Sequence, residues 1–289
     1  MADDVKALSD ELDRAGYLTD EALATALFLA VRMSQPILLE GEPGVGKTEA
    51  AKALARALDT KLIRLQCHEG LSVADALYEW NYPRQLLGIR LAEARGEALA
   101  EADLFSEDYL LARPLLAALE HPGPRPAVLL IDEVDRADDE FEAFLLELLA
   151  EATVTIPELG TRRAVLPPIA VLTSNRTREL HDALKRRCLY QWIAHPGVER
   201  VAEIVRRRVP GVEDWLAERV ARSVRVLREM ELYKPPGVAE AINWAAALDV
   251  LGVETFDESA LRHTMSAVLK YQEDRAVAEA RLAEVAGGG

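Results

Sequence analysis

Two hydrophobic patterns divide the chain near residue 195. Before that point, short apolar runs bounded by polar or turn residues predict buried strands, and apolar residues at helical spacing lie between these runs. Alternating strands and helices predict a three-layer α/β fold built on a parallel sheet. The predicted strands of this sheet are Ile37–Glu40, Lys61–Gln66, Ala127–Glu133, Ile169–Asn175 and Cys188–Ile193.

Beyond His195–Gly197, the apolar residues recur only at helical spacing. Proline and glycine in this triplet interrupt regular structure and mark a boundary between two domains. We therefore predict an α/β domain over residues 1–194 and a small all-α domain over residues 195–289. Helices in the second domain are predicted around residues 201–205, 215–227, 241–248 and 261–269.

Residues 72–120 interrupt the alternation with a segment that has little strand character. We predict two or three helices there, separated by an irregular aromatic stretch at Trp80–Pro83. The segment is longer than an ordinary connection, which is typical of an insertion that packs against or gates something. Its alternating charges, at residues 90–101, fit either a partner surface or a solvated helix face.

A glycine-rich loop joins the first predicted strand to a helix and follows the G-x-x-x-x-G-K-[ST] pattern of phosphate-binding loops. Glycines let backbone N–H groups converge on one anion, and the helix N-terminus adds partial positive charge. Lys47 is predicted to reach the β- and γ-phosphates and the Thr48 hydroxyl to ligate Mg²⁺. The alternative is a glycine-rich turn capped by Thr48, with Lys47 solvated. Predicted nucleotide-binding residues are Gly41, Glu42, Pro43, Gly44, Val45, Gly46, Lys47, Thr48, Glu49 and Asp132.

Polar side chains end two of the predicted buried strands. Asp132 and Glu133 follow one apolar run directly, and the carboxyl ends of parallel strands line the ligand-binding edge of such sheets. Asp132 is predicted to hold Mg²⁺ through water and Glu133 to polarise the attacking water. Asn175 ends another strand and is a candidate for binding the γ-phosphate or orienting the water. The alternative for Glu133 and for Asn175 is a helix cap.

Charge and composition narrow the classes of function. The chain has 34 Lys and Arg against 49 Asp and Glu, and this net charge of −15 argues against extensive nucleic-acid contact. Its two cysteines, Cys67 and Cys188, indicate neither a disulfide framework nor a zinc knuckle. The acidic N-terminus lacks a signal-peptide pattern, and no apolar run approaches the roughly 18 residues of a membrane span. We therefore expect a cytoplasmic protein without a membrane span.

Taken in order, these motifs resemble the AAA+ ATPases. A phosphate loop, a strand ending in Asp132, a strand ending in Asn175, a short helix ending in arginine and a helical domain form that family's set. Residues 133–137, 173–180 and 182–190 are similar to the MoxR branch of the family. Residues 69–70, 78–86 and 234–238 are similar to the CoxD-like group within that branch.

The resemblance implies a ring, commonly a hexamer, that binds ATP with Mg²⁺ between neighbouring subunits. Arg187 matches the arginine finger that reaches the next subunit's γ-phosphate, Arg186 is the second candidate, and Asn175 matches sensor 1. With Lys47 and Glu133, these three residues are the catalytic candidates. One departure is that many AAA+ proteins carry a sensor 2 arginine where this chain has Pro235–Glu240, so coupling of the lid to the nucleotide either uses another residue or is weaker.

MoxR-type proteins typically act as chaperone-like machines with a von Willebrand factor A partner, and residues 72–120 match their insertion in helix 2. CoxD-like members mature the metal centre of molybdenum hydroxylases such as carbon monoxide dehydrogenase. The resemblance therefore implies an ATPase that remodels or matures a client protein. Two alternatives share the fold. A nucleic-acid motor or loader is disfavoured by the net charge, and a nucleotide-gated scaffold with little turnover is disfavoured by the presence of Glu133 and Arg187 but kept open by the missing arginine.

Overall fold

The computed structural model describes residues 3–98 and 100–287, and the chain divides into two compact units. The sheet unit contains the chain up to Glu40 together with Thr48–Trp192. The helical unit contains the chain from Ile193 onward together with the loop Gly41–Lys47. The glycine-rich loop therefore packs with the C-terminal helices, although it joins a strand and a helix of the sheet unit.

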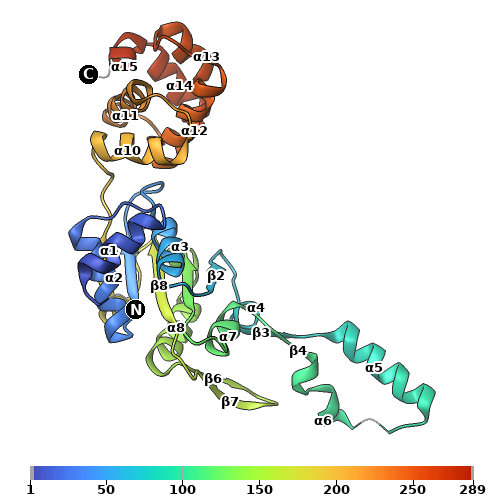
Figure 1. Ribbon diagram of the computed structural model, residues 1–289. Coiled ribbons are helices and arrows are strands. Elements are labelled where there is room, and N and C mark those ends of the chain that lie inside the picture. The colour runs from blue at the N-terminus through green and yellow to red at the C-terminus, as the bar shows by residue number, and fades with distance from the viewer. Residues whose placement is uncertain (1–2, 99, 288–289) are drawn as a thin grey trace. The chain divides into compact units, whose positions relative to one another are not determined.

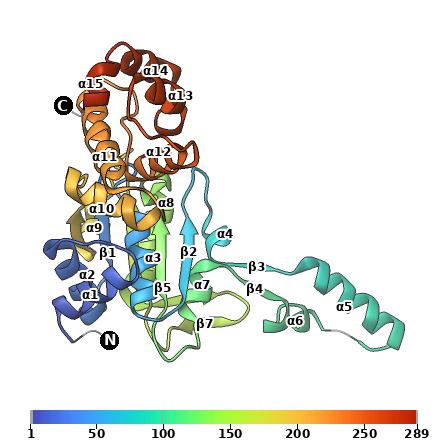
Figure 2. The same cartoon turned by 45° about the horizontal axis from the view of Figure 1, so that its top comes forward.

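A parallel sheet, with five strands in the described residues, forms the core of the sheet unit (Figure 2). Every residue of its three inner strands is buried, as expected for a parallel sheet covered on both faces. This sheet confirms the predicted α/β fold, and each predicted strand is present. In spatial order the strands are β2 (Leu62–Gln66), β5 (Val128–Asp132), β8 (Ile169–Ser174), β1 (Ile37–Glu40) and β9 (Leu189–Trp192).

Helices pack their apolar faces against this sheet (Figure 1). Leu38, Leu129 and Leu172 from the strands share one buried cluster with Leu115 and Phe141 from helices. Burying a side chain of this size contributes about 1.5–3 kcal/mol. The principal helices of the unit are α1 (Val5–Arg14), α2 (Glu21–Met33), α3 (Lys47–Ala57), α7 (Pro114–Leu119), α8 (Asp139–Glu151) and α9 (Asp182–Arg187).

The segment between β2 and α7 contains a pair of strands that the sequence pattern did not indicate. Strand β3 (Tyr78–Trp80) pairs antiparallel with β4 (Leu110–Ala112), and Figure 1 shows this ribbon leading away from the sheet. We call residues 78–112 the arm. The predicted helices are present, but the two strands were missed, because strands of three residues carry too little periodicity to be recognised. The segment's helices are α4 (Val73–Leu77), α5 (Tyr82–Arg95), α6 (Glu101–Leu104) and the 3₁₀ turn η1 (Glu107–Tyr109).

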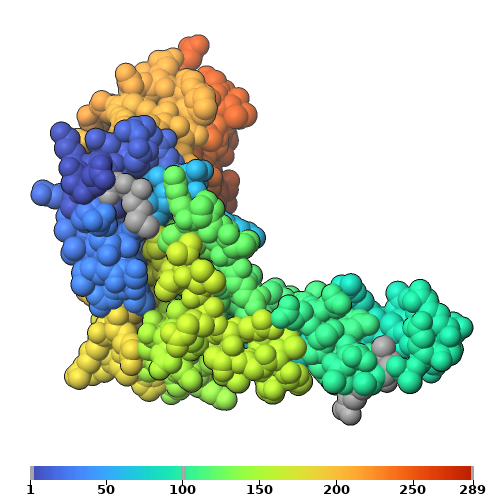
Figure 3. All heavy atoms as spheres, turned by 60° about the horizontal axis from the view of Figure 1, so that its bottom comes forward, coloured from blue at the N-terminus to red at the C-terminus, as the bar shows by residue number. Residues whose placement is uncertain are grey.

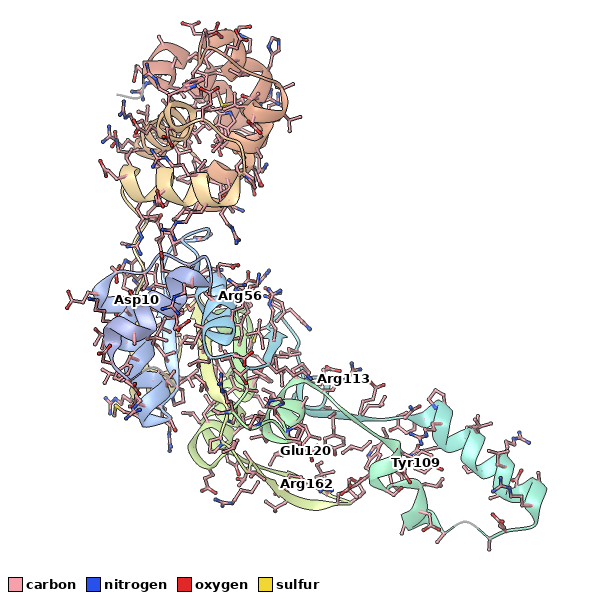
Figure 4. The ribbon with its side chains drawn as sticks, viewed as in Figure 1. Asp10, Arg56, Tyr109, Arg113, Glu120 and Arg162 are labelled. Atoms are coloured by element: carbon pink, nitrogen blue, oxygen red, sulfur yellow. The ribbon has the colours of Figure 1, made fainter. Side chains whose placement is uncertain are left out.

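The arm folds on itself through aromatic and polar contacts. The Trp80 and Phe105 rings meet edge to face at 5.2 Å, and the Gln85 amide donates to the Leu104 carbonyl at 2.6 Å. A hairpin of β6 (Thr153–Ile156) and β7 (Gly160–Arg163) reaches the arm, where Arg162 pairs with Glu107 at 2.6 Å. Figures 3 and 4 show this hairpin beside the arm, with Tyr109 and Arg162 labelled in Figure 4.

The helical unit has its own core. Trp244 is fully buried there, and its indole N–H donates to the Thr264 hydroxyl at 2.8 Å. The predicted helices are present, and α14 and α15 are additional. No helix in the described part of the chain is long and apolar enough to cross a membrane. The helices are α10 (Val198–Arg208), α11 (Asp214–Glu229), α12 (Val238–Val250), α13 (Glu258–Val268), α14 (Gln272–Glu279) and α15 (Leu282–Gly287).

Candidate functional site

Both predicted metal-binding residues meet at the carboxyl edge of the sheet. Asp132 ends β5, and only 2% of its surface is exposed. Its Oδ1 accepts hydrogen bonds from the Thr48 hydroxyl on α3, at 2.9 Å, and from the Thr173 hydroxyl on β8, at 2.6 Å. Thr48 follows Lys47 directly, so the glycine-rich motif delivers a hydroxyl to the strand-ending carboxylate.

The donor set at this edge fits Mg²⁺. This ion prefers oxygen ligands, usually keeps several waters and takes one or two carboxylates from the protein. Asp132 supplies a carboxylate, and the hydroxyls of Thr48 and Thr173 lie within hydrogen-bonding distance of it. The chemistry of these side chains is therefore the chemistry that a nucleotide-bound magnesium ion requires.

An arginine that the sequence analysis did not single out also contacts Asp132. Arg64, on β2, donates from Nε at 3.0 Å and from Nη2 at 2.6 Å to Asp132 Oδ2. The two strands are neighbours, and Gln66 lies opposite Asp132 in the register. The available signal in the sequence was the alternation of apolar and polar residues along β2. In a strand, this alternation puts Arg64 on the face opposite Ile63 and Leu65.

Glu133 is held by its backbone at the end of β5. It has a left-handed φ of 55°, and its N–H donates to the Thr173 hydroxyl at 2.9 Å. Its side chain lies 3.2 Å from Arg136 and makes no capping hydrogen bond to the described residues of the following 3₁₀ turn, η2 (Val134–Arg136). Glu133 thus occupies the N-cap position of this turn without a side-chain cap, while Asp138 caps the next α-helix.

Asn175 lies in a loop that Asp135 anchors. Asp135 is 2% exposed, and its Oδ2 accepts from the backbone N–H of Asn175 at 3.2 Å and of Thr177 at 2.8 Å. The Thr177 hydroxyl adds a third bond at 2.7 Å. The next helix, α9, begins only at Asp182, so Asn175 does not cap it. Asp135 therefore positions this loop, a role that no motif in the sequence indicated.

The glycine-rich loop lies in the helical unit, where Gly44 and Gly46 adopt positive φ angles of 81° and 97°. The Lys47 ammonium donates to the loop's own carbonyls, at 2.7 Å to Gly41 and 2.8 Å to Glu42. The positive charge of Lys47 therefore lies within the loop that would surround a phosphate. Of the other predicted binding residues, Pro43 lies within the loop, Val45 is buried, and Glu49 lies in the first turn of α3.

Within the helical unit, backbone atoms of the C-terminal helices contact the glycine-rich loop. The Val238 N–H, at the start of α12, donates to the Gly44 carbonyl at 3.0 Å. Glu240, at the position without a sensor 2 arginine, instead accepts from the Gly237 N–H at 2.9 Å and so caps α12. Arg228, at the end of α11, pairs with Glu42. These contacts are the candidates for coupling between lid and nucleotide.

Replacing Gly237 by alanine is expected to weaken ATP binding about tenfold. A Cβ at this position would lie 2.8 Å from Gly44 Cα and 3.0 Å from the Gly44 carbonyl oxygen, and backbone atoms so close must shift. A control is Gly197→Ala, because a Cβ there meets only a side-chain oxygen at 3.7 Å. Calorimetric titration measures the affinity for ATP, and an unchanged dissociation constant in Gly237→Ala would contradict this account.

Arg186 and Arg187 end α9, and both are exposed. The Gln35 side-chain amide donates to the backbone carbonyl of Arg187 at 3.2 Å. This bond holds the backbone of Arg187 and does not involve its guanidinium group. Among the residues that the structure describes, neither arginine forms an ion pair within 4.0 Å. Both side chains are therefore available to a neighbouring molecule.

Cys67 and His195 have pKa values that their surroundings shift. The Cys67 N–H donates to the Asp132 carbonyl, and burial, followed by the negative charge of Asp132, raises the pKa of the Cys67 thiol to about 12. This thiol is not expected to act as a nucleophile. In the helical unit, burial and then the positive charge of Arg228 lower the pKa of His195.

Residues 36–188, more than half of the chain, match the AAA domain (dynein-related subfamily) family. A Lon protease of Desulforamulus reducens is 31% identical over 160 residues, which are 50% of this chain and 16% of that protein. Chaperone MoxR1 of Mycobacterium tuberculosis is 27% identical over 205 residues, 68% of this chain and 45% of MoxR1. The denitrification regulatory protein NirQ of Pseudomonas aeruginosa is 24% identical over 217 residues, 73% of this chain and 74% of NirQ. The chain thus spans less than half the length of the Lon protease and of MoxR1.

The chain is also similar in fold to solved structures. The RuvB Holliday junction branch migration motor of Thermotoga maritima superposes with a TM-score of 0.52 at 20% identity. The match covers 90% of this chain and 72% of the RuvB chain. At that identity, the similarity shows a shared architecture and carries no information about what this chain acts on.

Proposed function

Because the chain belongs to the AAA domain (dynein-related subfamily) family, we propose that it is a Mg²⁺-dependent ATPase that uses hydrolysis to remodel or mature a partner protein. The observation that carries this proposal is the 2.9 Å hydrogen bond from Thr48 to Asp132. This bond joins the glycine-rich motif to the strand-ending carboxylate, and in P-loop ATPases the same pair of groups holds the magnesium ion of a bound nucleotide.

ATP binding is assigned to the loop and the start of α3. Backbone N–H groups of the loop residues other than Pro43 surround the phosphates, helped by the positive φ angles of Gly44 and Gly46. Lys47 exchanges its bonds to the loop carbonyls for bonds to the β- and γ-phosphates. Thr48 and Asp132 hold Mg²⁺, which neutralises charge on the phosphates when it is bound.

Hydrolysis is assigned to residues at the ends of β5 and β8. Glu133 follows Asp132 and accepts hydrogen bonds from the attacking water, which it orients toward the γ-phosphate. Asn175 binds that phosphate or the water from the neighbouring strand. Asp135 supports the role of Asn175 indirectly, because its three hydrogen bonds fix the loop that carries Asn175.

The site is proposed to be completed by a second subunit in a ring, most simply a hexamer. Support comes from the exposed guanidinium groups of Arg186 and Arg187, which form no ion pair with the described residues. A cation from the neighbour would stabilise charge that develops on the γ-phosphate, and such arginines are worth about 10³- to 10⁵-fold in turnover.

The finer proposal is a MoxR-type, CoxD-like chaperone that acts in the cytoplasm with a von Willebrand factor A partner. Its support is the similarity to chaperone MoxR1 and the sequence resemblances at residues 69–70, 78–86 and 234–238. A client with a molybdenum centre, such as carbon monoxide dehydrogenase, follows from the same resemblance. Addition of such a partner and client is expected to raise the ATPase rate, and no response to either would contradict the finer proposal.

Replacing Lys47 by alanine is expected to raise the dissociation constant for ATP about 10- to 100-fold, the value of a lost charged hydrogen bond to phosphate. Lys270→Ala is the matched control, because this exposed lysine also donates to backbone carbonyls, at 3.3 Å to Ser266 and 2.9 Å to Ala267, and lies outside the proposed binding residues. Calorimetric titration with ATP and Mg²⁺ measures both variants. ATP binding by Lys47→Ala that equals wild type would contradict the proposed function.

A further inference from the structure

Asp132 is fully occupied by protein groups, and only one of them carries a charge. Its Oδ1 accepts from the hydroxyls of Thr48 and Thr173, while its Oδ2 accepts from two nitrogens of Arg64. The Asp132 side chain is 3% exposed, so the Arg64 guanidinium neutralises a buried carboxylate. An unpaired charge at that depth would be costly.

The surroundings of Arg64 allow its side chain to move away from Asp132. Its side chain is 47% exposed and reaches Asp132 from the surface of the unit. One of its nitrogens also donates to Gln66, on the same strand, so the guanidinium has another polar partner. An arginine with solvent access and a second acceptor can swing away without leaving a buried cation behind.

Mg²⁺ and Arg64 are both cations that would interact with the Asp132 carboxylate. The proposed function, on which this inference rests, requires Asp132 to face a divalent cation. A guanidinium bound to the same carboxylate repels that cation, and solvent at the half-exposed Arg64 side chain screens this repulsion only in part. Both cations neutralise the carboxylate, so the arrival of one favours the departure of the other.

We propose that Arg64 competes with Mg²⁺ for Asp132 and thereby sets the Mg²⁺ concentration at which the nucleotide site fills. Without Mg²⁺, Arg64 keeps the carboxylate neutralised and correctly oriented. With Mg²⁺ and nucleotide, Arg64 turns toward solvent and the Gln66 side chain. Arg64 is thus a positioning residue whose charge opposes metal binding, the reverse of what a residue that supports the metal would do.

The test is the Mg²⁺ concentration that gives half-maximal ATP binding, measured by calorimetry at fixed ATP. Arg64→Gln is expected to lower this concentration about tenfold, because the competing unit charge is gone. Arg64→Lys keeps a cation with fewer donors, and its value is expected between those of Arg64→Gln and wild type. Arg113→Gln is the matched control, since Arg113 is 48% exposed and pairs with Glu79 of the arm (Figure 4).

Thermal unfolding gives an independent readout. Without Mg²⁺, Arg64→Gln is expected to melt below wild type, because Asp132 has lost its cation. Addition of Mg²⁺ and ATP is expected to raise its melting temperature by more than it raises that of wild type. An Arg64→Gln protein that needs the same Mg²⁺ concentration as wild type, or a higher one, would overturn the inference alone. Wild type without any Mg²⁺-dependent ATP binding would overturn the proposed function as well.

Discussion

Glu133→Gln is expected to bind ATP and Mg²⁺ as wild type does and to hydrolyse ATP about 10²- to 10⁴-fold more slowly, the usual contribution of a positioned acid or base. Glutamine keeps the size and shape of the side chain but cannot accept a proton from water. The backbone N–H of residue 133 still donates to Thr173 in the variant, so its position at the end of β5 is preserved.

Steady-state phosphate release at saturating Mg²⁺ and ATP measures this effect. Glu140→Gln is the matched control, because Glu140 is exposed in the first turn of α8 and lies outside the proposed machinery. Calorimetric titration shows whether the variant still binds ATP. If Glu133→Gln hydrolyses ATP as fast as wild type, Glu133 does not orient the attacking water.

Arg187→Ala is expected to lower turnover about 10³-fold or more, as removal of an arginine finger does, and to leave ATP affinity nearly unchanged. The reason is that Arg187 acts on the nucleotide of a neighbouring subunit only as charge develops during hydrolysis. Arg186→Ala is the comparison, because Arg186 is the adjacent exposed arginine on α9. If Arg186→Ala is the inactive variant, the finger is Arg186.

Mixing two inactive variants separates action on a neighbour from action within one subunit. An Arg187→Ala subunit retains Glu133, and a Glu133→Gln subunit retains Arg187. Where the two alternate in a ring, some interfaces combine an intact Glu133 with an intact Arg187, so activity is expected to return in part. A mixture as inactive as its components would contradict a site shared between subunits.

The strands of the sheet could be predicted from the sequence because each of them is determined by its own residues. In β1, β5 and β8 every residue is buried, so each strand is a continuous apolar run between polar segments. Strands β3 and β4 have a different cause. They pair with each other across the helices of the arm, and neither has three buried residues in a row. Their pairing is tertiary and leaves no pattern in either segment.

The C-terminal helices show the same limit. Helix α14 is short and mostly polar, and its buried residues include Ala278 and Asp274. Asp274 is buried because it accepts from the backbone N–H groups of Tyr233 and Lys234, at 2.6 and 3.1 Å. A helix held by a polar anchor does not show the apolar spacing by which helical segments are recognised.

At the candidate site, the sequence predicted the residues that belong to continuous motifs. Thr48 and Asp132 were expected together and lie 2.9 Å apart. Arg64 was missed because its contact with Asp132 spans 68 positions and depends on which strands are neighbours in the sheet. The contact of Gly237 with Gly44 was missed for the same reason. Roles that depend on the register of strands, or on the packing of a loop, cannot be derived from spacing along the chain.

The most direct test of the central claim is the ATPase rate per subunit as protein concentration rises, with Mg²⁺ present. A Mg²⁺-dependent ATPase whose site is completed by a neighbour is expected to gain specific activity as subunits assemble, and Arg187→Ala is expected to remain inactive throughout. A specific rate that stays constant over the whole concentration range while the protein assembles, or that Arg187→Ala reproduces, would contradict a site shared between subunits.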